Sequence, residues 1–146
     1  MKQIKVIGHR GAAGLEPENT LLAFKKALKL GVDELELDIL PSKDGHLMVI
    51  HDDKIDRTTN GSGYVKNLTL SELKKLNAGK GEKIPTLNEV FDLIKNKNVI
   101  LNIELKKSGY ENKVVDLIKK YKFEKKVLVI SFVADAIKKI APVEFQ

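Results

Sequence analysis

One short motif near the start of the chain combines side chains that suit an anionic oxygen ligand. His9 and Arg10 stand between Gly8 and Gly11, and glycines allow close approach of the backbone to a ligand. A guanidinium binds phosphate oxygens through paired hydrogen bonds, and an imidazole exchanges a proton near neutral pH. The motif therefore indicates a phosphate site, and the alternative is a tight strand-to-helix turn with an exposed His and Arg.

Carboxylates and a second histidine recur farther along the chain. Three carboxylates could form a hard-oxygen site for Mg²⁺ or Ca²⁺, and two imidazoles could supply a general acid and a general base. A lone histidine at a strand end is more often structural, so the chemical interpretation depends on the whole set. Arg10 and Lys106 remain to neutralise a phosphate. The candidate residues are His9, Arg10, Glu36, Asp38, His51, Glu104 and Lys106.

Strand and helix signals alternate along the chain and predict the elements that position these residues. Strands are predicted over 4–8, 33–40, 46–51, 99–105 and 127–131. Helices are predicted over 19–30, 71–77, 87–97, 110–122 and 134–141. Repeated strand–helix order is typical of a parallel sheet with helices packed on it, in which strand ends share one rim. His46, after the turn at 44–45, is expected to be an exposed turn residue.

Two of the predicted strands alternate polar and apolar residues. Residues 34, 36 and 38 are acidic, while 35, 37 and 39 are apolar. In the second strand, residues 99, 101, 103 and 105 are apolar, while 102, 104 and 106 are Asn, Glu and Lys. One explanation is an antiparallel sheet with one face in water. The intervening helices favour the other, in which helices cover the apolar face and the acids point into a barrel. Carboxylates placed there must be paired or bind a metal.

Composition limits the classes of protein to consider. The chain has 146 residues, enough for one ordinary domain, with 42% hydrophobic and 32% charged residues and no cysteine. Disulfides, zinc–thiolate sites and thiol nucleophiles are therefore excluded. The net charge of +6 comes mostly from lysines on predicted helix faces, and with no Trp and two arginines we expect no nucleic-acid partner. Without a signal-peptide pattern or an apolar run of membrane-spanning length, we expect a cytoplasmic protein with no membrane span.

Taken in order, the motifs resemble those of the glycerophosphodiester phosphodiesterase family. The resemblance extends from residue 4 to about 132, and no single piece would be specific alone. The segments that carry it are 8–11, 17–20, 36–38, 51–52, 84–87, 102–106 and 130–132.

The resemblance implies a fold, a reaction and a role for each candidate residue. The fold would be α/β, a (β/α)₈ TIM barrel, with a small insertion at about 53–82 in a single domain over 1–146. The reaction would be metal-dependent hydrolysis of glycerophosphodiesters to glycerol 3-phosphate and an alcohol. His9 and His51 would be the catalytic acid/base pair, Glu36, Asp38 and Glu104 the ligands of a divalent cation (Mg²⁺ or Ca²⁺), and Arg10 and Lys106 the phosphate contacts.

Length is the point at which the chain departs from the family pattern. A (β/α)₈ barrel needs about 250 residues, so this chain holds about five of the eight units and ends after the fifth strand and helix. Such a sheet exposes edges that a homo-oligomer could cover to complete the barrel. Two alternatives to the phosphodiesterase stay open: an inactive truncated barrel that binds a phosphodiester or a protein, and an enzyme of the lysophospholipase D type.

Overall fold

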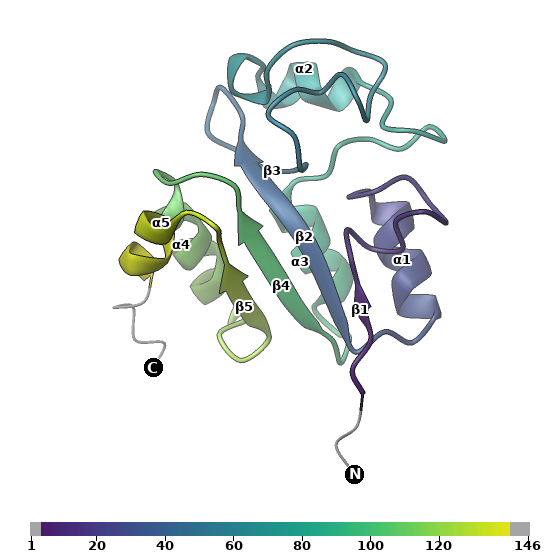
Figure 1. The fold of residues 1–146 in the computed structure, drawn as a ribbon, viewed down its shortest axis with the longest axis vertical. Coiled ribbons are helices and arrows are strands. Elements are labelled where there is room, and N and C mark those ends of the chain that lie inside the picture. Colours follow the sequence, from purple (N-terminus) through teal and green to yellow (C-terminus); the bar gives the residue numbers. More distant parts are fainter. Residues whose placement is uncertain (1–3, 141–146) are drawn as a thin grey trace.

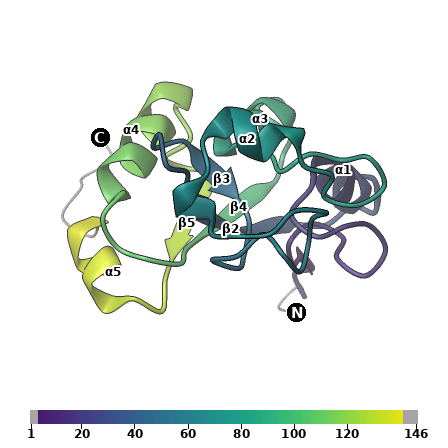
Figure 2. The ribbon, with the colours of Figure 1, turned by 90° about the horizontal axis from the view of Figure 1, so that it is seen from above.

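The computed structural model describes residues 4–140, which form an α/β fold with helices packed on one face of a sheet (Figures 1 and 2). Four strands run parallel in the order β1-β2-β4-β5: β1 (Ile7–Gly8), β2 (Glu34–Pro41), β4 (Ile100–Leu105) and β5 (Val127–Ile130). The helices are α1 (Leu21–Lys29), α2 (Leu70–Lys75), α3 (Leu87–Ile94), α4 (Glu111–Tyr121) and α5 (Ala134–Ile140), with a 3₁₀ turn η1 (Val65–Asn67). Every predicted strand and helix is present; residue 141, the predicted end of the last helix, lies outside the described residues.

Threonine caps fix where three of the helices begin. The Thr20 hydroxyl accepts from the backbone N–H of Ala23 at the start of α1. Thr69 and Thr86 form complete capping boxes, each with a glutamate three residues later, at the starts of α2 and α3. These side chains satisfy N–H groups that have no partner inside the helix, so the local sequence specifies these boundaries.

The alternating strands separate an apolar core from an acidic face. Leu35, Leu37 and Ile39 are fully buried against α1, α3 and α4, while Glu36 and Asp38 point to the opposite side of the sheet. Parallel pairing of β2 with β4 continues both rows, since Asp38 pairs with Glu104. The antiparallel one-wet-face alternative is therefore wrong, and the acids line what would be the inside of a barrel.

Strand β3 (Leu47–Val49) corrects one expectation. It runs antiparallel to β2, with Ile39 opposite Val49, and lies off the parallel path. The sequence analysis placed it among the parallel strands, yet only residues 42–46 separate it from β2. Parallel neighbours need a crossover of about a dozen residues or more, whereas a hairpin needs only a turn. The described part of the chain thus contains four parallel strands and one hairpin strand, not five parallel strands.

A second, smaller apolar cluster lies beyond the carboxyl ends of the parallel strands. It joins the end of the hairpin to the segment that carries η1 and α2, which is seen above the sheet in Figure 1. Its buried members are Leu40, Met48, Ile50, Ile55, Val65, Leu73, Ala78 and Ile84.

Among residues 4–140, no helix is both long and apolar enough to cross a bilayer.

Candidate active site

The loop that carries His9 and Arg10 is held tightly by its own backbone. Arg10 and Asn19 both adopt left-handed conformations, with φ of 51° and 56°, and the Asn19 N–H donates to the Arg10 carbonyl over 3.0 Å. Gly11 has φ of +79°, and a Cβ there would lie 2.7 Å from the carbonyl carbon of Ala23 in α1. Only glycine permits this contact, so the loop presents Arg10 toward β2. Left-handed non-glycine residues are uncommon and gather at functional sites.

Three carboxylates from two neighbouring strands form the centre of the site. Each of Glu36, Asp38 and Glu104 places a carboxylate oxygen within 4.8 Å of the other two. Asp38 is 1% exposed, and the Glu104 side chain 12% exposed. Strand register brings Glu104 beside Asp38, so the close packing of charge follows from β2–β4 pairing.

Cationic groups surround the carboxylates. The Arg10 Nε lies 3.4 Å from Asp38 Oδ2, and its backbone N–H donates to Glu36 Oε2 over 2.9 Å. Lys106 Nζ donates to Glu104 Oε1 over 2.8 Å and lies 3.6 Å from Asp38. On the opposite side, His9 Nε2 is 3.8 Å from Glu36 Oε2. Six of the seven candidate residues are therefore in one contiguous cluster.

The cluster fits a divalent cation on two observations. Burial raises the pKa of the Glu36 carboxyl, and the neighbouring Asp38 and Glu104 charges raise it further, against a backbone hydrogen bond from Arg10 that lowers it. Asp38 Oδ1 is buried and lacks a hydrogen bond among the described residues. A hard cation bound to carboxylate oxygens would offset the repulsion and give Asp38 Oδ1 a ligand.

His51 reaches the site by a different route from the one expected. It lies two residues past β3, which folds back along β2 far enough for the Ile50 N–H to donate to the Asp38 carbonyl over 3.0 Å. The hairpin, and not a parallel strand end, thus brings His51 level with Asp38. Its Nδ1 is 2.6 Å from Asp52 Oδ1.

Ion pairs join His51 to Arg10 through three residues for which the sequence analysis gave no role. Glu18 accepts from Arg10 (Nη1–Oε1, 3.0 Å) and from both Arg57 Nη atoms (2.9 and 2.8 Å). Arg57 also donates to Asp52, from Nε over 2.7 Å and from Nη2 over 3.1 Å. We call the series Arg10–Glu18–Arg57–Asp52–His51 the bridging network.

A sequence signal for the bridging network did exist. Glu18 and Asp52 lie inside the motifs already singled out, and Arg57 is one of two arginines in a chain with 26 Lys and Arg residues. A guanidinium can contact two carboxylates at once through its planar fork, which lysine cannot. Where lysine is otherwise used almost throughout, an arginine that closely follows acidic residues indicates such a contact.

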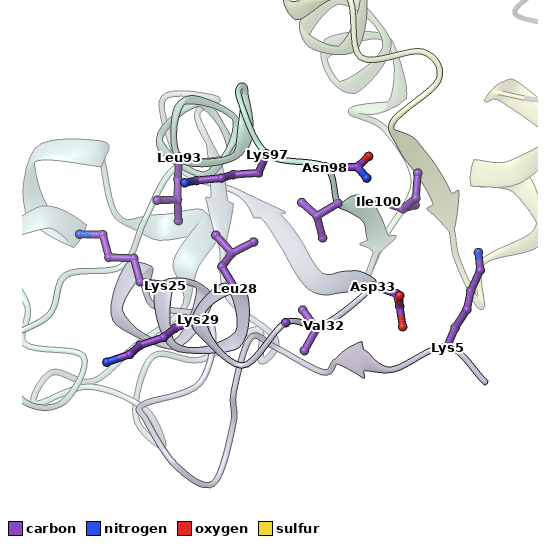
Figure 3. A pocket seen from close by; sticks show the side chains of 12 residues that line it. Lys5, Lys25, Leu28, Lys29, Val32, Asp33, Leu93, Lys97, Asn98 and Ile100 are labelled. Carbon is purple, nitrogen blue, oxygen red and sulfur yellow. The ribbon is translucent and has the colours of Figure 1, made fainter. Parts of the chain in front are cut away.

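A cavity away from the candidate site lies at the other end of the sheet. A cavity of about 790 Å³ lies at the opposite, amino-terminal ends of β2 and β4, between residues such as Lys5, Val32, Lys97 and Ile100 (Figure 3). None of the seven candidate residues lines it. The acidic cluster instead occupies the face of the sheet that lies opposite the helices.

Comparisons with known proteins identify relatives of this arrangement. The model of the glycerophosphoryl diester phosphodiesterase family matches residues 9–142. A glycerophosphodiester phosphodiesterase of Caldanaerobacter subterraneus is 52% identical over 139 residues, which is 87% of this chain and 57% of the relative.

Solved structures of glycerophosphodiester phosphodiesterases and related enzymes also match this chain. The crystal structure of a glycerophosphodiester phosphodiesterase from Agrobacterium tumefaciens superposes with a TM-score of 0.89 at 36% identity, over 96% of this chain and 64% of that one. An Oleispira antarctica phosphodiesterase, solved with its product sn-glycerol-3-phosphate, gives 0.90 at 33% identity, over 96% and 62%. The chain therefore spans about three fifths of the length of these relatives, and its fold is a part of their TIM-type barrel.

Proposed function

Because the chain belongs to the glycerophosphoryl diester phosphodiesterase family, we propose that its acidic cluster is the site of a metal-dependent hydrolysis of glycerophosphodiesters. The products would be glycerol 3-phosphate and an alcohol. The observation that carries the proposal is the convergence of Glu36, Asp38 and Glu104 within 4.8 Å of one another, with Arg10 and Lys106 beside them. The relative solved with sn-glycerol-3-phosphate supports a small-molecule phosphate ester as the ligand.

The three carboxylates would hold the cation, Mg²⁺ or Ca²⁺. A divalent cation supplies Lewis-acid polarisation of a phosphoryl oxygen. Arg10 and Lys106 already lie within 4 Å of these carboxylates, so a phosphate at the cluster would meet two positive side chains. Their charges would bind the phosphate and stabilise the negative charge that grows on it in the transition state.

His9 and His51 are proposed as the acid/base pair. One imidazole would take the proton of the attacking hydroxyl, and the other would protonate the departing alkoxide. Family resemblance favours attack by the 2-hydroxyl of glycerol, giving a cyclic phosphate that water then opens; direct attack by water uses the same two residues. His9 stands beside Glu36, and His51 is oriented by Asp52, so each has a carboxylate that can stabilise its charged form.

The test is release of glycerol 3-phosphate from glycerophosphocholine and glycerophosphoethanolamine with Mg²⁺, with Ca²⁺ and with a chelator. We expect metal-dependent release that His9→Ala abolishes. His46→Ala is the matched control, because His46 is an exposed histidine on the β2–β3 hairpin turn. Equal release by the two variants would contradict the assignment of His9.

An inactive barrel is the second candidate function, favoured by the exposed inner face of β5, where Leu128 is 55% exposed. A folded chain that binds glycerol 3-phosphate in the presence of metal but releases none would support it. Two further expectations, a cytoplasmic location and a homo-oligomer that completes the barrel, stay predictions.

A further inference from the structure

The bridging network connects the two ends of the candidate site through a single side chain. Arg57 lies in the segment that follows the hairpin, and its guanidinium makes four hydrogen bonds, two to Glu18 and two to Asp52. Glu18 in turn contacts Arg10, and Asp52 contacts His51. These two carboxylates belong to different segments of the chain, 34 positions apart, so Arg57 holds the β1–α1 loop against the hairpin.

Two carboxylate oxygens of the bridging network each contact both Arg57 and a candidate site residue. Glu18 Oε1 accepts from both Arg10 and Arg57, and Asp52 Oδ1 accepts from Arg57 while it faces His51 Nδ1. Each carboxylate is thus fixed by Arg57 in the orientation that it offers to the site residue. Paired guanidinium–carboxylate bonds are geometrically specific, and Arg57 makes one such pair with each partner.

The charge state of Asp52 adds a consequence for His51. The Arg57 guanidinium, followed by the His51 ring, holds the pKa of the Asp52 carboxyl well below its usual range. An ionised carboxylate only accepts hydrogen bonds, so the His51 nitrogen that faces it must carry the proton. That nitrogen is Nδ1, which leaves Nε2 as the nitrogen that can take up a proton.

We propose that Arg57 is a positioning residue, which fixes the orientation of Arg10 through Glu18 and the tautomer of His51 through Asp52. The inference rests on the proposed function for its kinetic consequences, but its structural content can be measured without turnover. Arg57 is half exposed, and exposed ion pairs contribute little to stability, so its role is orientation of its neighbours rather than maintenance of the fold.

Side-chain ¹⁵N NMR of the histidines at about pH 8, where an ordinary imidazole is neutral, tests the inference directly. The chain has three histidines, and the His9→Ala and His46→Ala variants assign the third set of signals to His51. We expect the Nδ1–H tautomer of His51 in the unaltered chain and a mixture of both tautomers in Arg57→Gln. An unchanged His51 spectrum in Arg57→Gln would overturn the inference.

Two further variants separate orientation from charge and from stability. Lys54→Gln removes one positive charge from an exposed position three residues away and should leave the His51 spectrum as it was. Arg57→Lys keeps the charge without the fork, so its melting temperature should stay within about 3 °C of that of the unaltered chain, yet the single tautomer should not return. Full recovery of the tautomer by lysine would show that charge alone suffices, against the proposal.

Kinetics supply an independent readout. In Arg57→Gln we expect kcat for glycerophosphocholine to fall about 10- to 100-fold, the range found for residues that orient the ligands of a metal, and Lys54→Gln to stay within about twofold. Unaltered turnover in Arg57→Gln would overturn the inference while the proposed function stands. If the unaltered chain releases no glycerol 3-phosphate, the proposed function fails for this chain, and the NMR spectra still decide the role of Arg57.

Discussion

Glu36 is a carboxyl whose ionisation the fold opposes, whereas most carboxyls of folded proteins are held in the ionised form. Its folded-state pKa is raised, chiefly by burial. Below the unfolded pKa, the group is neutral in both states and costs nothing. As pH rises through the folded pKa, the folded state must carry a buried charge, so stability is lost toward neutral pH.

The Glu36→Gln variant should therefore be more stable than the unaltered chain at pH 7 in the presence of a chelator. At about pH 3 the difference should vanish, because the carboxyl that glutamine replaces is then almost entirely neutral in both states. Added Mg²⁺ should raise the melting temperature of the unaltered chain and much less that of the variant. Calorimetry under the three conditions measures this, at about 3 °C per kcal/mol for a domain of this size.

Glu124→Gln, in the turn between α4 and β5, is the control for a carboxyl outside the cluster. It should show neither the gain at pH 7 nor the loss of the Mg²⁺ effect. A Glu36→Gln variant that is less stable than the unaltered chain at pH 7 would contradict the account of Glu36 as a buried charge without its counter-ion.

Among the elements, two identical capping boxes begin helices in different apolar clusters. Thr69 begins α2, whose Leu73 lies in the small cluster, and Thr86 begins α3, whose Phe91 lies in the main core. We propose that residues 53–82 are an insertion that opens on its own. Thr86→Ala should then lower the free energy of global unfolding by about 1 kcal/mol, the usual cost of losing such a cap.

Thr69→Ala should instead speed hydrogen exchange in η1 and α2 without an equal loss in global stability, because local opening needs less free energy than global unfolding. Exchange rates read by mass spectrometry and denaturant midpoints distinguish the two variants. If Thr69→Ala lowers the midpoint as much as Thr86→Ala does, the segment unfolds together with the sheet.

Comparison of sequence and structure at this scale shows what local pattern can and cannot specify. Alternation in β2 and β4 predicted the acidic face, because side chains on a strand point to opposite sides regardless of what surrounds them. The direction of β3 was missed, since the apolar run at 47–50 looks the same in either orientation. The Asp44–Gly45 pair, a strong hairpin signal between two strands, held the missing information.

The rarity of arginine indicated that Arg57 contacts carboxylates, but the sequence pattern did not identify which distant side chains it meets. The bridging network depends on how the segment after the hairpin folds over the β1–α1 loop, and nothing in the spacing of Glu18, Asp52 and Arg57 specifies that approach. By contrast, the cluster of Glu36, Asp38 and Glu104 needed only parallel pairing of two strands. The roles assigned to the seven candidate residues stay predictions until variants are measured.

At the scale of the whole molecule, the sheet presents two edges. Within residues 4–140, β1 pairs with β2 alone and β5 with β4 alone. Apolar side chains are exposed at both edges, among them Val6 before β1 and Ile7 on it, and Leu128 on β5 and Phe132 after it. Exposed edges with apolar neighbours favour pairing with another polypeptide.

The 146-residue chain should accordingly associate with itself as its concentration rises. Leu128→Lys places a charge on the inward face of β5 and should shift the equilibrium toward monomer, because a desolvated lysine opposes a buried interface. Sedimentation velocity over a range of concentrations measures both, with Lys125→Gln in the preceding turn as the control. A chain that stays monomeric throughout would contradict the expectation of a homo-oligomer.

The order of the strands along the chain also determines which of them are synthesised first. All seven candidate residues lie between positions 9 and 106, on or just after strands that are direct neighbours in space, whereas β5 begins about 20 residues later. Ribosomes add about 5 to 20 residues per second. The nascent chain therefore contains all the residues of the acidic cluster about one to four seconds before β5 is synthesised. A cation bound at that stage would act as a template on which β2 and β4 align during synthesis.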